Sequence, residues 1–243
     1  MNLKVMTYNI HSSIGTDGKV DWLRIADLIK KEAPDLLALE EVTVNHAQSP
    51  GLDVPRSIAG ELDMNVCFGK AIPINDGKGE YGVAALSPHP IELVEKIYLP
   101  TPDGIEKRIA VIVKVQLKKP IFFAVTHFSY QGEFPGDEEY RTRSAELIRK
   151  TLDEKGCYPV IWAGDFNTFQ STPTVDFIQS SWDVHNNANP DIPTAHCQHA
   201  GWQQIDFICS APKNAFRLLE FKVIDDLLAS DHRPVCATLQ LPE

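Results

Sequence analysis

The sequence predicts an α+β fold in which two β-sheets pack face to face and helices cover their outer sides. Segments with strand character outnumber helical segments along the 243 residues. Several of them, such as residues 158–163, are apolar at consecutive positions, so they need cover on both faces. The chain contains no repeat, low-complexity tract or Pro/Gly-rich linker, and we expect a single domain over residues 1–243.

The predicted strands are rich in Val, Ile and Phe and are spread over the whole chain. They are expected at residues 3–10, 35–40, 82–87, 91–98, 109–117, 121–128, 158–163, 205–210, 216–224 and 233–241. Polar or glycine-containing segments connect them and are expected to be loops, at residues 43–57, 73–80, 99–107, 129–139 and 183–204.

Helices are expected at residues 21–33, at residues 139–154 and from near Thr172. In the first, Asp21 can cap the N-terminus, apolar side chains fall on one face, and Pro34 ends the helix. The second shows apolar residues at helical spacing, and the third carries a proline in its first turn. These helices would supply the outer layers.

The charge balance argues against a surface that binds duplex nucleic acid. The chain has 33 acidic and 23 basic residues and a formal net charge of −10. Proteins that hold DNA neutralise its phosphates with clustered Lys and Arg, whereas basic residues such as Lys30 and Lys31 occur here as pairs. We therefore expect no stable binding of duplex nucleic acid.

The cysteines and the N-terminus indicate the compartment. Five cysteines are widely spaced, and several lie in apolar runs where a reduced thiol packs well, which is typical of a reducing environment. The opening residues MNLKVMTYNI alternate like a strand and lack the apolar region of a signal peptide, and no apolar run has the length of a membrane span. We expect a cytoplasmic protein without a membrane anchor.

Polar side chains recur where the predicted strands end. They are Asn9, Glu40, Glu41, His127, Asp165, Asn167, Asp206, Ser230, Asp231 and His232. Polar groups in such positions are costly unless they are paired or bound to an ion, so their recurrence predicts one shared site. For the stretch WAGDFNT, residues 162–168, an ordinary turn is the alternative, because Gly, Asp and Asn all favour turns.

The residue types in this set predict the chemistry. Carboxylates and amides are hard oxygen ligands that suit Mg²⁺ or Mn²⁺. The histidines can donate a proton or a hydrogen bond to a developing oxyanion. Together these groups fit the hydrolysis of a phosphate ester by activated water.

Seven motifs carry a resemblance to a known family. TYNI, LALEEV, YGVAALS, VTHF, GDFN, QIDFI and SDHRPV occur in the order and approximate spacing of the endonuclease/exonuclease/phosphatase superfamily. The resemblance covers about residues 3–241 and implies a four-layer α/β/β/α sandwich of the deoxyribonuclease I type, and Mg²⁺-dependent (or Mn²⁺-dependent) hydrolysis of a phosphoric ester.

The resemblance also implies roles for individual residues. Glu41 would be the main metal ligand, with Asn9 and Asp231 close to the ion; the adjacent Glu40 leaves the choice of glutamate open from the residues alone, but many relatives carry Gln at its position. Asp165 would position or deprotonate the attacking water. His232, oriented by Asp206, would stabilise the transition state or protonate the leaving oxygen.

Several further residues would contact the substrate. Asn167 and His127 would hold phosphate oxygens, and Tyr81 in the YG element would line the site, although a core aromatic explains Tyr81 almost as well. Arg108 and Arg141 are further candidates for phosphate contacts, with a solvated or structural arginine as the alternative.

Four functions remain open at this point. The leading one is a phosphodiesterase, and the alternatives are a phosphomonoesterase acting on a sugar or inositol phosphate, a nuclease, and a non-catalytic binding module. His11 stands where abasic-site endonucleases carry an acidic residue, which weakens a repair role. The complete set of catalytic residue types disfavours a silent module.

The connecting segments indicate the kind of substrate. We expect residues 43–57, 99–107 and 129–139 to form walls of the pocket, because they follow strands that carry site residues. Acidic residues Asp137, Glu138 and Glu139 would repel a long polyanion. The expected partner is a small or locally presented phosphoester, and the expected state is a monomer.

Other histidines are expected to lie outside the site. The stretch HCQH, residues 196–199, lacks a second Cys/His pair nearby and is predicted to be an ordinary loop rather than a zinc site. His46, His89 and His185 have no partner visible in the sequence and are predicted to lie on the surface.

Overall fold

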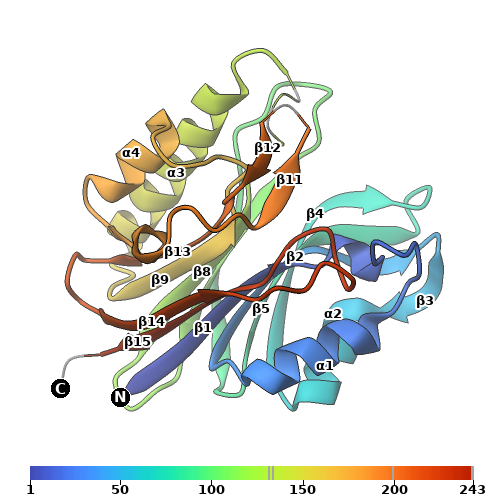
Figure 1. The fold of residues 1–243 in the computed structure, drawn as a ribbon, viewed down its shortest axis with the longest axis horizontal. Helices are drawn as coiled ribbons and strands as arrows, with labels where there is room; N and C mark the ends of the chain where they lie inside the picture. The colour runs from blue at the N-terminus through green and yellow to red at the C-terminus, as the bar shows by residue number, and fades with distance from the viewer. Residues whose placement is uncertain (131, 133, 199, 242–243) are drawn as a thin grey trace.

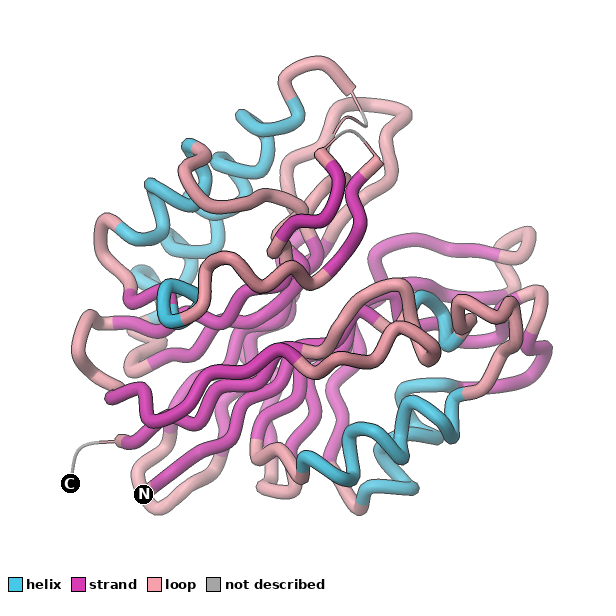
Figure 2. The backbone as a smooth tube through the Cα atoms, viewed as in Figure 1, coloured by secondary structure: helices cyan, strands magenta, loops and turns pink. Residues whose placement is uncertain are grey.

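Two β-sheets pack face to face, with helices on the outside of each, in the computed structural model of the protein (Figures 1 and 2). The structure describes residues 1–130, 132, 134–198 and 200–241. This arrangement confirms the predicted α/β/β/α sandwich. One sheet comprises, in order, β14 (Arg217–Val223), β15 (Val235–Gln240), β1 (Asn2–Asn9), β2 (Leu36–His46), β5 (Gly79–Ser87) and β4 (Asn65–Ile74), and β3 (Ser49–Asp53) pairs with β2.

The second sheet faces the first and carries the other half of the site. Its strand order is β10 (Asp183–Val184), β13 (Asp206–Ala211), β9 (Val160–Asp165), β8 (Ile121–His127), β7 (Ile109–Val115) and β6 (Ile91–Tyr98). The remaining elements are the helices α1 (Trp22–Glu32), α2 (Val54–Leu62), α3 (Asp137–Lys155) and α4 (Pro173–Gln179), the short 3-10 helices η1 (His11–Ser13) and η2 (His185–Ala188), and the hairpin β11 (Ala195–Cys197) and β12 (Gly201–Gln203).

The core explains why the strands are apolar at consecutive positions. Side chains such as Val5, Ala38, Val111 and Val125 fill the space between the two sheets. On the outer faces, α1 and α2 pack on the first sheet and α3 and α4 on the second, as Figure 1 shows. Strands covered on both faces need apolar residues at successive positions rather than alternating ones.

Each sheet has a parallel strand pair near its middle, and these pairs position the site. β1 pairs in parallel with β2, so that Asn9 lies beside Glu40. β8 pairs in parallel with β9, so that His127 lies beside Asp165. The carboxyl ends of parallel strands meet at one edge of a sheet. The two sheets therefore bring polar side chains to the same edge of the sandwich.

Two predicted loops contain regular structure. Residues 43–57 include the end of β2, all of β3 and the start of α2, and residues 183–204 include β10, η2, β11 and β12. β4 was also missed. In α2, Asp53 caps the N-terminus and Pro55 lies in the first turn, but Pro, Ser and Gly lower the helix propensity of the segment. Packing of its apolar face on the first sheet stabilises it instead.

The predicted helix at residues 21–33 is confirmed with its cap. The side chain of Asp21 accepts a hydrogen bond from the backbone N–H of Arg24, and Ala33 ends the helix in the left-handed conformation before Pro34. None of the helices in the described part of the chain combines the length and the apolar character needed to cross a membrane.

Candidate active site

A cleft opens where β1, β8 and β9 end and beside Glu41 in the middle of β2, and it has a volume of about 410 Å³. Most of the predicted site residues line it, namely Glu41, Tyr81, Arg108, His127, Asp165, Asn167, Asp231 and His232. Asn9 and Asp206 lie directly behind this lining, in contact with Asp165 and His232 respectively. Residues distant in the sequence thus meet at one place.

Asp165 lies at the centre of this cluster and is almost fully buried. Its Oδ2 lies 3.0 Å from Asn9 Nδ2, 3.4 Å from His127 Nε2 and 3.8 Å from His232 Nε2. Burial, and after it the charge of Asp206, raises the pKa of Asp165 to about 7. A carboxyl group that titrates near neutral pH is well matched to accepting a proton from water.

The glycine before Asp165 allows β9 to approach β8 closely. A Cβ atom at Gly164 would lie 2.0 Å from the carbonyl oxygen of Thr126, its partner in the parallel pair. The same pairing places His127 beside Asp165, and the antiparallel pairing with β13 places Asp206 on its other side. Asp165 is therefore held on the central strand between two residues of the site.

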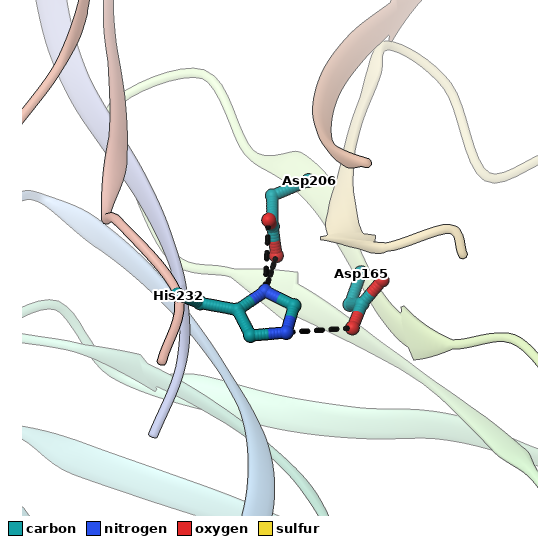
Figure 3. A group of neighbouring side chains, drawn as sticks. All are labelled: Asp165, Asp206 and His232. Atoms are coloured by element: carbon teal, nitrogen blue, oxygen red, sulfur yellow. Dashed lines mark hydrogen bonds and ion pairs between the residues drawn. The ribbon is translucent and has the colours of Figure 1, made fainter. Parts of the chain in front are cut away.

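Figure 3 shows His232 between two carboxylates. Its Nδ1 lies 3.0 and 3.2 Å from the two oxygens of Asp206, while its Nε2 faces Asp165. Burial alone lowers the pKa of His232, but the charges of Asp206 and Asp165 outweigh it and hold the pKa well above the usual 6.5. The protonated ring, oriented by Asp206, presents an Nε2–H donor near Asp165.

His127 is in the opposite electrostatic setting. Burial, and after it the positive charge of Arg108, lowers the pKa of His127 well below 6.5, so the ring is neutral. Arg108 Nη1 lies 3.0 Å from Nδ1, and Asn167 Nδ2 lies 3.0 Å from Nε2. The backbone N–H of Asn167 also donates to Asp165 Oδ1 at 2.9 Å. These groups form a hydrogen-bonding wall opposite His232.

A β-bulge in β2 separates the two neighbouring glutamates. The register with β5 shifts between Leu39 and Val42, and Glu41 adopts a φ of 55°. Glu41 lines the cleft, whereas Glu40 is fully buried and its Oε1 accepts a hydrogen bond from Thr7 Oγ1 at 3.0 Å. Bulges commonly redirect side chains next to active sites. The structure thus brings Glu41, and not Glu40, into the cleft.

Asn9 links acidic side chains of the two sheets. Its Nδ2 donates to Glu41 Oε1 and to Asp165 Oδ2, both at 3.0 Å, and its Oδ1 accepts the backbone N–H of His11 at 3.1 Å. Because a backbone N–H can only donate, this contact defines which end of the amide carries the oxygen. Asn9 thus bridges the two acids, and its predicted position close to a metal ion stays a prediction.

The donor set of the cleft fits a divalent cation. The carboxylates of Glu41, Asp165 and Asp231 line it, whereas the protonated His232, held by Asp206, has no free ring nitrogen to bind an ion. Oxygen-rich sets of this kind suit Mg²⁺ or Mn²⁺. A bound cation would also relieve the repulsion between buried acids that contributes to the raised pKa of Asp165.

Arg141 lies outside the cleft, which corrects its prediction as a substrate contact. Its guanidinium lies 2.9 Å from Glu138 Oε2 and 3.1 Å from Asp137 Oδ2, and it donates to the carbonyl of Ser129. The side chain is buried in these contacts. Arg141 therefore connects the start of α3 to the loop after β8, which is the structural role given as its alternative.

Three further predictions about the surroundings are corrected or limited. His185 is buried rather than on the surface, and its Nε2 lies 2.9 Å from Ser210 Oγ, because η2 packs against β13. Segment 43–57 contributes none of the residues known to line the cleft, since it forms β3 and α2 instead. In HCQH, His196 lines the cleft, Cys197 is buried, and His199 lies outside the described residues.

Two residues that hold the site were not identified from the sequence. Asn186 in η2 donates to the carbonyl of Asp206 and accepts from the backbone N–H of Ile208. Thr194 Oγ1 accepts from the backbone N–H of Asp206 at 3.3 Å. Both lie in a segment predicted to be a loop, and nothing in their spacing pointed to Asp206.

Known proteins match this chain over nearly its whole length. The sequence profile of the Endonuclease/Exonuclease/phosphatase family matches residues 6–232. No curated protein matches the sequence. Solved structures do match the fold of this chain, however, and three of them are the following.

An endonuclease/exonuclease/phosphatase from Beutenbergia cavernae is 24% identical, covers 99% of this chain and 72% of its own, and has a TM-score of 0.80. The mannosyl-6-phosphatase of Bacteroides thetaiotaomicron is 20% identical over 98% of this chain and 100% of its own, with a TM-score of 0.74. The human Nocturnin catalytic domain, with bound sulfate anion, is 18% identical over 99% of this chain and 95% of its own, with a TM-score of 0.75. These likenesses establish the fold.

Proposed function

The chain belongs to the endonuclease/exonuclease/phosphatase family, a family of hydrolases, and we propose that it is a metal-dependent phosphoesterase that cleaves a phosphodiester with activated water. The observation that carries this proposal is the position of Asp165. This buried carboxyl group titrates near neutral pH and lies within 4 Å of an asparagine from the other sheet, a neutral histidine and a protonated histidine. That arrangement suits a base that acts beside a phosphoryl group.

In the proposed mechanism each side chain has a task that its surroundings support. Asp165 accepts the proton of the attacking water. The neutral His127 accepts from Arg108 at Nδ1, so its proton is on Nε2 and is available to a phosphate oxygen. Asn167 would contact a second phosphate oxygen, and Arg108 supplies positive charge beside them. His232, held by Asp206, donates from Nε2 to an oxygen on which negative charge develops.

Glu41 and Asp231 would hold the metal ion, with Asn9 fixing Glu41 and Asp165 relative to each other. When bound, Mg²⁺ or Mn²⁺ would neutralise charge on the phosphoryl oxygens. The 3.8 Å between His232 Nε2 and Asp165 Oδ2 allows both side chains to reach one phosphoryl group. Water activation and charge stabilisation would therefore act on the same transition state.

A phosphomonoester of a sugar is the second candidate. It is favoured by the mannosyl-6-phosphatase among the similar structures, which covers 98% of this chain. The cleft of about 410 Å³ suits a small ester of either kind. A nuclease acting on duplex DNA has less support, because the formal net charge of −10 disfavours a surface that neutralises many phosphates.

A panel of phosphomonoesters and phosphodiesters with Mg²⁺ and Mn²⁺ tests the proposal. We expect EDTA to abolish turnover, the metal to restore it, and Glu41→Gln to raise the metal concentration needed for half-maximal activity, because the substitution removes a charge while keeping the shape. Glu146→Gln, an exposed glutamate on α3, is the matched control and should behave as wild type. Full activity in EDTA would refute the mechanism.

A further inference from the structure

We propose that Thr194 is a positioning residue for the proposed reaction, because it holds Asp206 and His232 in the relative arrangement that directs His232 Nε2 to the phosphoryl group. This proposal rests on the proposed phosphoesterase function and goes beyond the residues assigned to it. Thr194 directly precedes β11 and is fully buried, although its side chain carries a hydroxyl group. A buried hydroxyl group is costly unless it is hydrogen-bonded, so its contacts indicate its role.

The side chain of Thr194 completes the start of β13. Its Oγ1 accepts hydrogen bonds from two consecutive backbone N–H groups, that of Ile205 at 3.0 Å and that of Asp206 at 3.3 Å. On the side of β13 away from β9, β10 pairs with Cys209 and Ser210, and no strand among the described residues pairs with Asp206 there. The threonine hydroxyl, which has two acceptor lone pairs, therefore takes the place of the missing strand.

The backbone of Thr194 reaches the segment that carries His232. Its carbonyl accepts a hydrogen bond from the backbone N–H of Arg233 at 2.7 Å, and the next residue, Ala195, forms an antiparallel β-bridge with His232. Thr194 is thus bonded through its side chain to the strand of Asp206 and through its main chain to the segment of His232. One residue therefore sets the position of one segment relative to the other.

The arrangement that Thr194 supports leaves little room for displacement. His232 Nδ1 lies 3.0 and 3.2 Å from the two oxygens of Asp206, and His232 Nε2 lies 3.8 Å from Asp165 Oδ2 (Figure 3). A shift of Asp206 would rotate the ring and redirect Nε2, and a misplacement of about 1 Å at a reacting group can lower the rate about 10²-fold. Because the Thr194 side chain is fully buried, it acts through Asp206 and His232 and does not touch the substrate.

Thr194→Val provides the kinetic test, because valine keeps the shape of threonine and removes the acceptor. We expect kcat on the ester found in the panel to fall at least about tenfold and KM to change less than about twofold, since the metal and phosphate contacts are kept. Thr194→Ser restores the oxygen and should return kcat to within about twofold of wild type. A purely structural role predicts a lower melting temperature with unchanged kcat, and that result would overturn the proposal.

Thr174→Val is the matched control. Thr174 is also a fully buried threonine with a bonded hydroxyl, whose Oγ1 lies 2.9 Å from Thr142 Oγ1, but it belongs to α4 on the outside of the second sheet. We expect it to lower the melting temperature and to leave kcat unchanged, and an equal fall of kcat in both valine variants would overturn the proposal. If circular dichroism shows that Thr194→Val does not fold, Thr194→Ala removes the same oxygen and carries the same expectation.

A spectroscopic measurement separates the failure of this inference from the failure of the proposed function. The NMR chemical shift of the His232 Nδ1 nitrogen, assigned by comparison with His232→Gln, reports the hydrogen bond to Asp206 and requires no substrate. We expect this shift to change in Thr194→Val and to keep its wild-type value in Thr194→Ser and Thr174→Val. If no ester in the panel is cleaved but the shift follows this pattern, only the phosphoesterase proposal fails. An unchanged shift in Thr194→Val would overturn the positioning role, whatever ester the protein cleaves.

Discussion

Asp165 and His232 are the residues on which the proposed chemistry depends most directly. Asp165→Asn keeps the size and the hydrogen-bonding reach of the side chain but removes its basicity, and we expect it to lower kcat by about 10²-fold or more. His232→Ala removes a charged donor and should cost a comparable factor. Steady-state rates on the ester found in the panel measure both effects, and circular dichroism checks that the fold is kept.

The short distance between the two side chains makes the double variant informative. Because His232 Nε2 lies 3.8 Å from Asp165 Oδ2, both groups would act on one transition state, and the double variant should lose much less than the product of the two single losses. Near wild-type kcat for Asp165→Asn would refute the mechanism. Fully multiplicative losses would show that the two residues act independently.

His185 predicts a dependence of stability on pH that is separate from the active site. Burial lowers its pKa to about 4, so between about pH 4 and 6.5 the unfolded chain binds the proton more readily than the folded one. The stability contributed by the neutral ring is therefore complete above pH 6.5 and is lost as the pH falls towards 4.

The His185→Gln variant isolates this contribution. Relative to wild type it should gain about 2 kcal/mol in the free energy of unfolding between pH 7.5 and pH 5, because Gln cannot become charged. Urea unfolding at both pH values measures the change. His46→Gln, at a partly exposed histidine, is the control and should show a much smaller effect. An equal response of the two variants would contradict the assignment to burial.

At the scale of single residues, the sequence predicted which side chains meet but not how each is oriented. Strand ends with Asn9, Asp165 and His127 could be recognised because parallel strands bring their carboxyl ends together. The bulge that turns Glu41 into the cleft could not, since it depends on the register between β2 and β5. The orientation of the Asn9 amide depends on the backbone of η1, so it could not be predicted from the sequence either.

At the scale of elements, α3 depends on an internal network at its first turn. The N-cap residue Gly136 makes no side-chain cap, but Asp137 and Glu138 both contact the buried guanidinium of Arg141. Glu138 Oε1 also accepts from the backbone N–H of Thr174 at 3.1 Å, near the start of α4. One arginine thus stabilises two acidic side chains, one of which, Glu138, connects α3 to α4.

Removing Arg141 should therefore destabilise the fold without changing the chemistry. Arg141→Met leaves two partly buried carboxylates without their partner, and we expect a loss of about 2 kcal/mol in the free energy of unfolding. The kcat/KM of the folded fraction should stay the same, because Arg141 lies outside the cleft. Arg143→Met, whose partner Glu139 is exposed, is the control and should cost less than about 1 kcal/mol. A selective loss of activity in Arg141→Met would show instead that Arg141 contributes to the substrate site.

The elements that the sequence missed share a physical cause. β3, α2, β11 and β12 are short or carry Pro and Gly, so their local propensity is weak. They form because they pack on the sheets, as α2 does on the first sheet, or because they are joined to the catalytic segment, as β11 is through Ala195 and His232. Long apolar strands such as β7 and β8 were predicted closely, because their burial on both faces leaves a strong pattern.

At the scale of the whole molecule, charge sets the kind of partner that can approach. The formal net charge is −10, and the residues that line the cleft include Glu41, Glu106, Asp165 and Asp231. The structure modifies the predicted contribution of segment 129–139, because Asp137 and Glu138 are paired with Arg141, and Glu139, although exposed, lies 3.8 Å from Arg143. Repulsion of a polyanion therefore comes mainly from the overall charge.

The negative net charge predicts weak binding of duplex DNA. A 20-base-pair duplex should bind with a Kd weaker than about 10⁻⁶ M at physiological salt, because few phosphates can be neutralised and little counterion release accompanies binding. Fluorescence anisotropy with Asp165→Asn, which should leave the duplex intact, measures this with and without Mg²⁺. A labelled trinucleotide is the comparison: if only a small or locally presented phosphoester fits the site, lengthening the strand should add almost no affinity, and the salt dependence should stay shallow. Sub-micromolar duplex binding with a steep salt dependence would show instead that a basic surface outweighs the net charge, and the restriction to small esters would then be wrong.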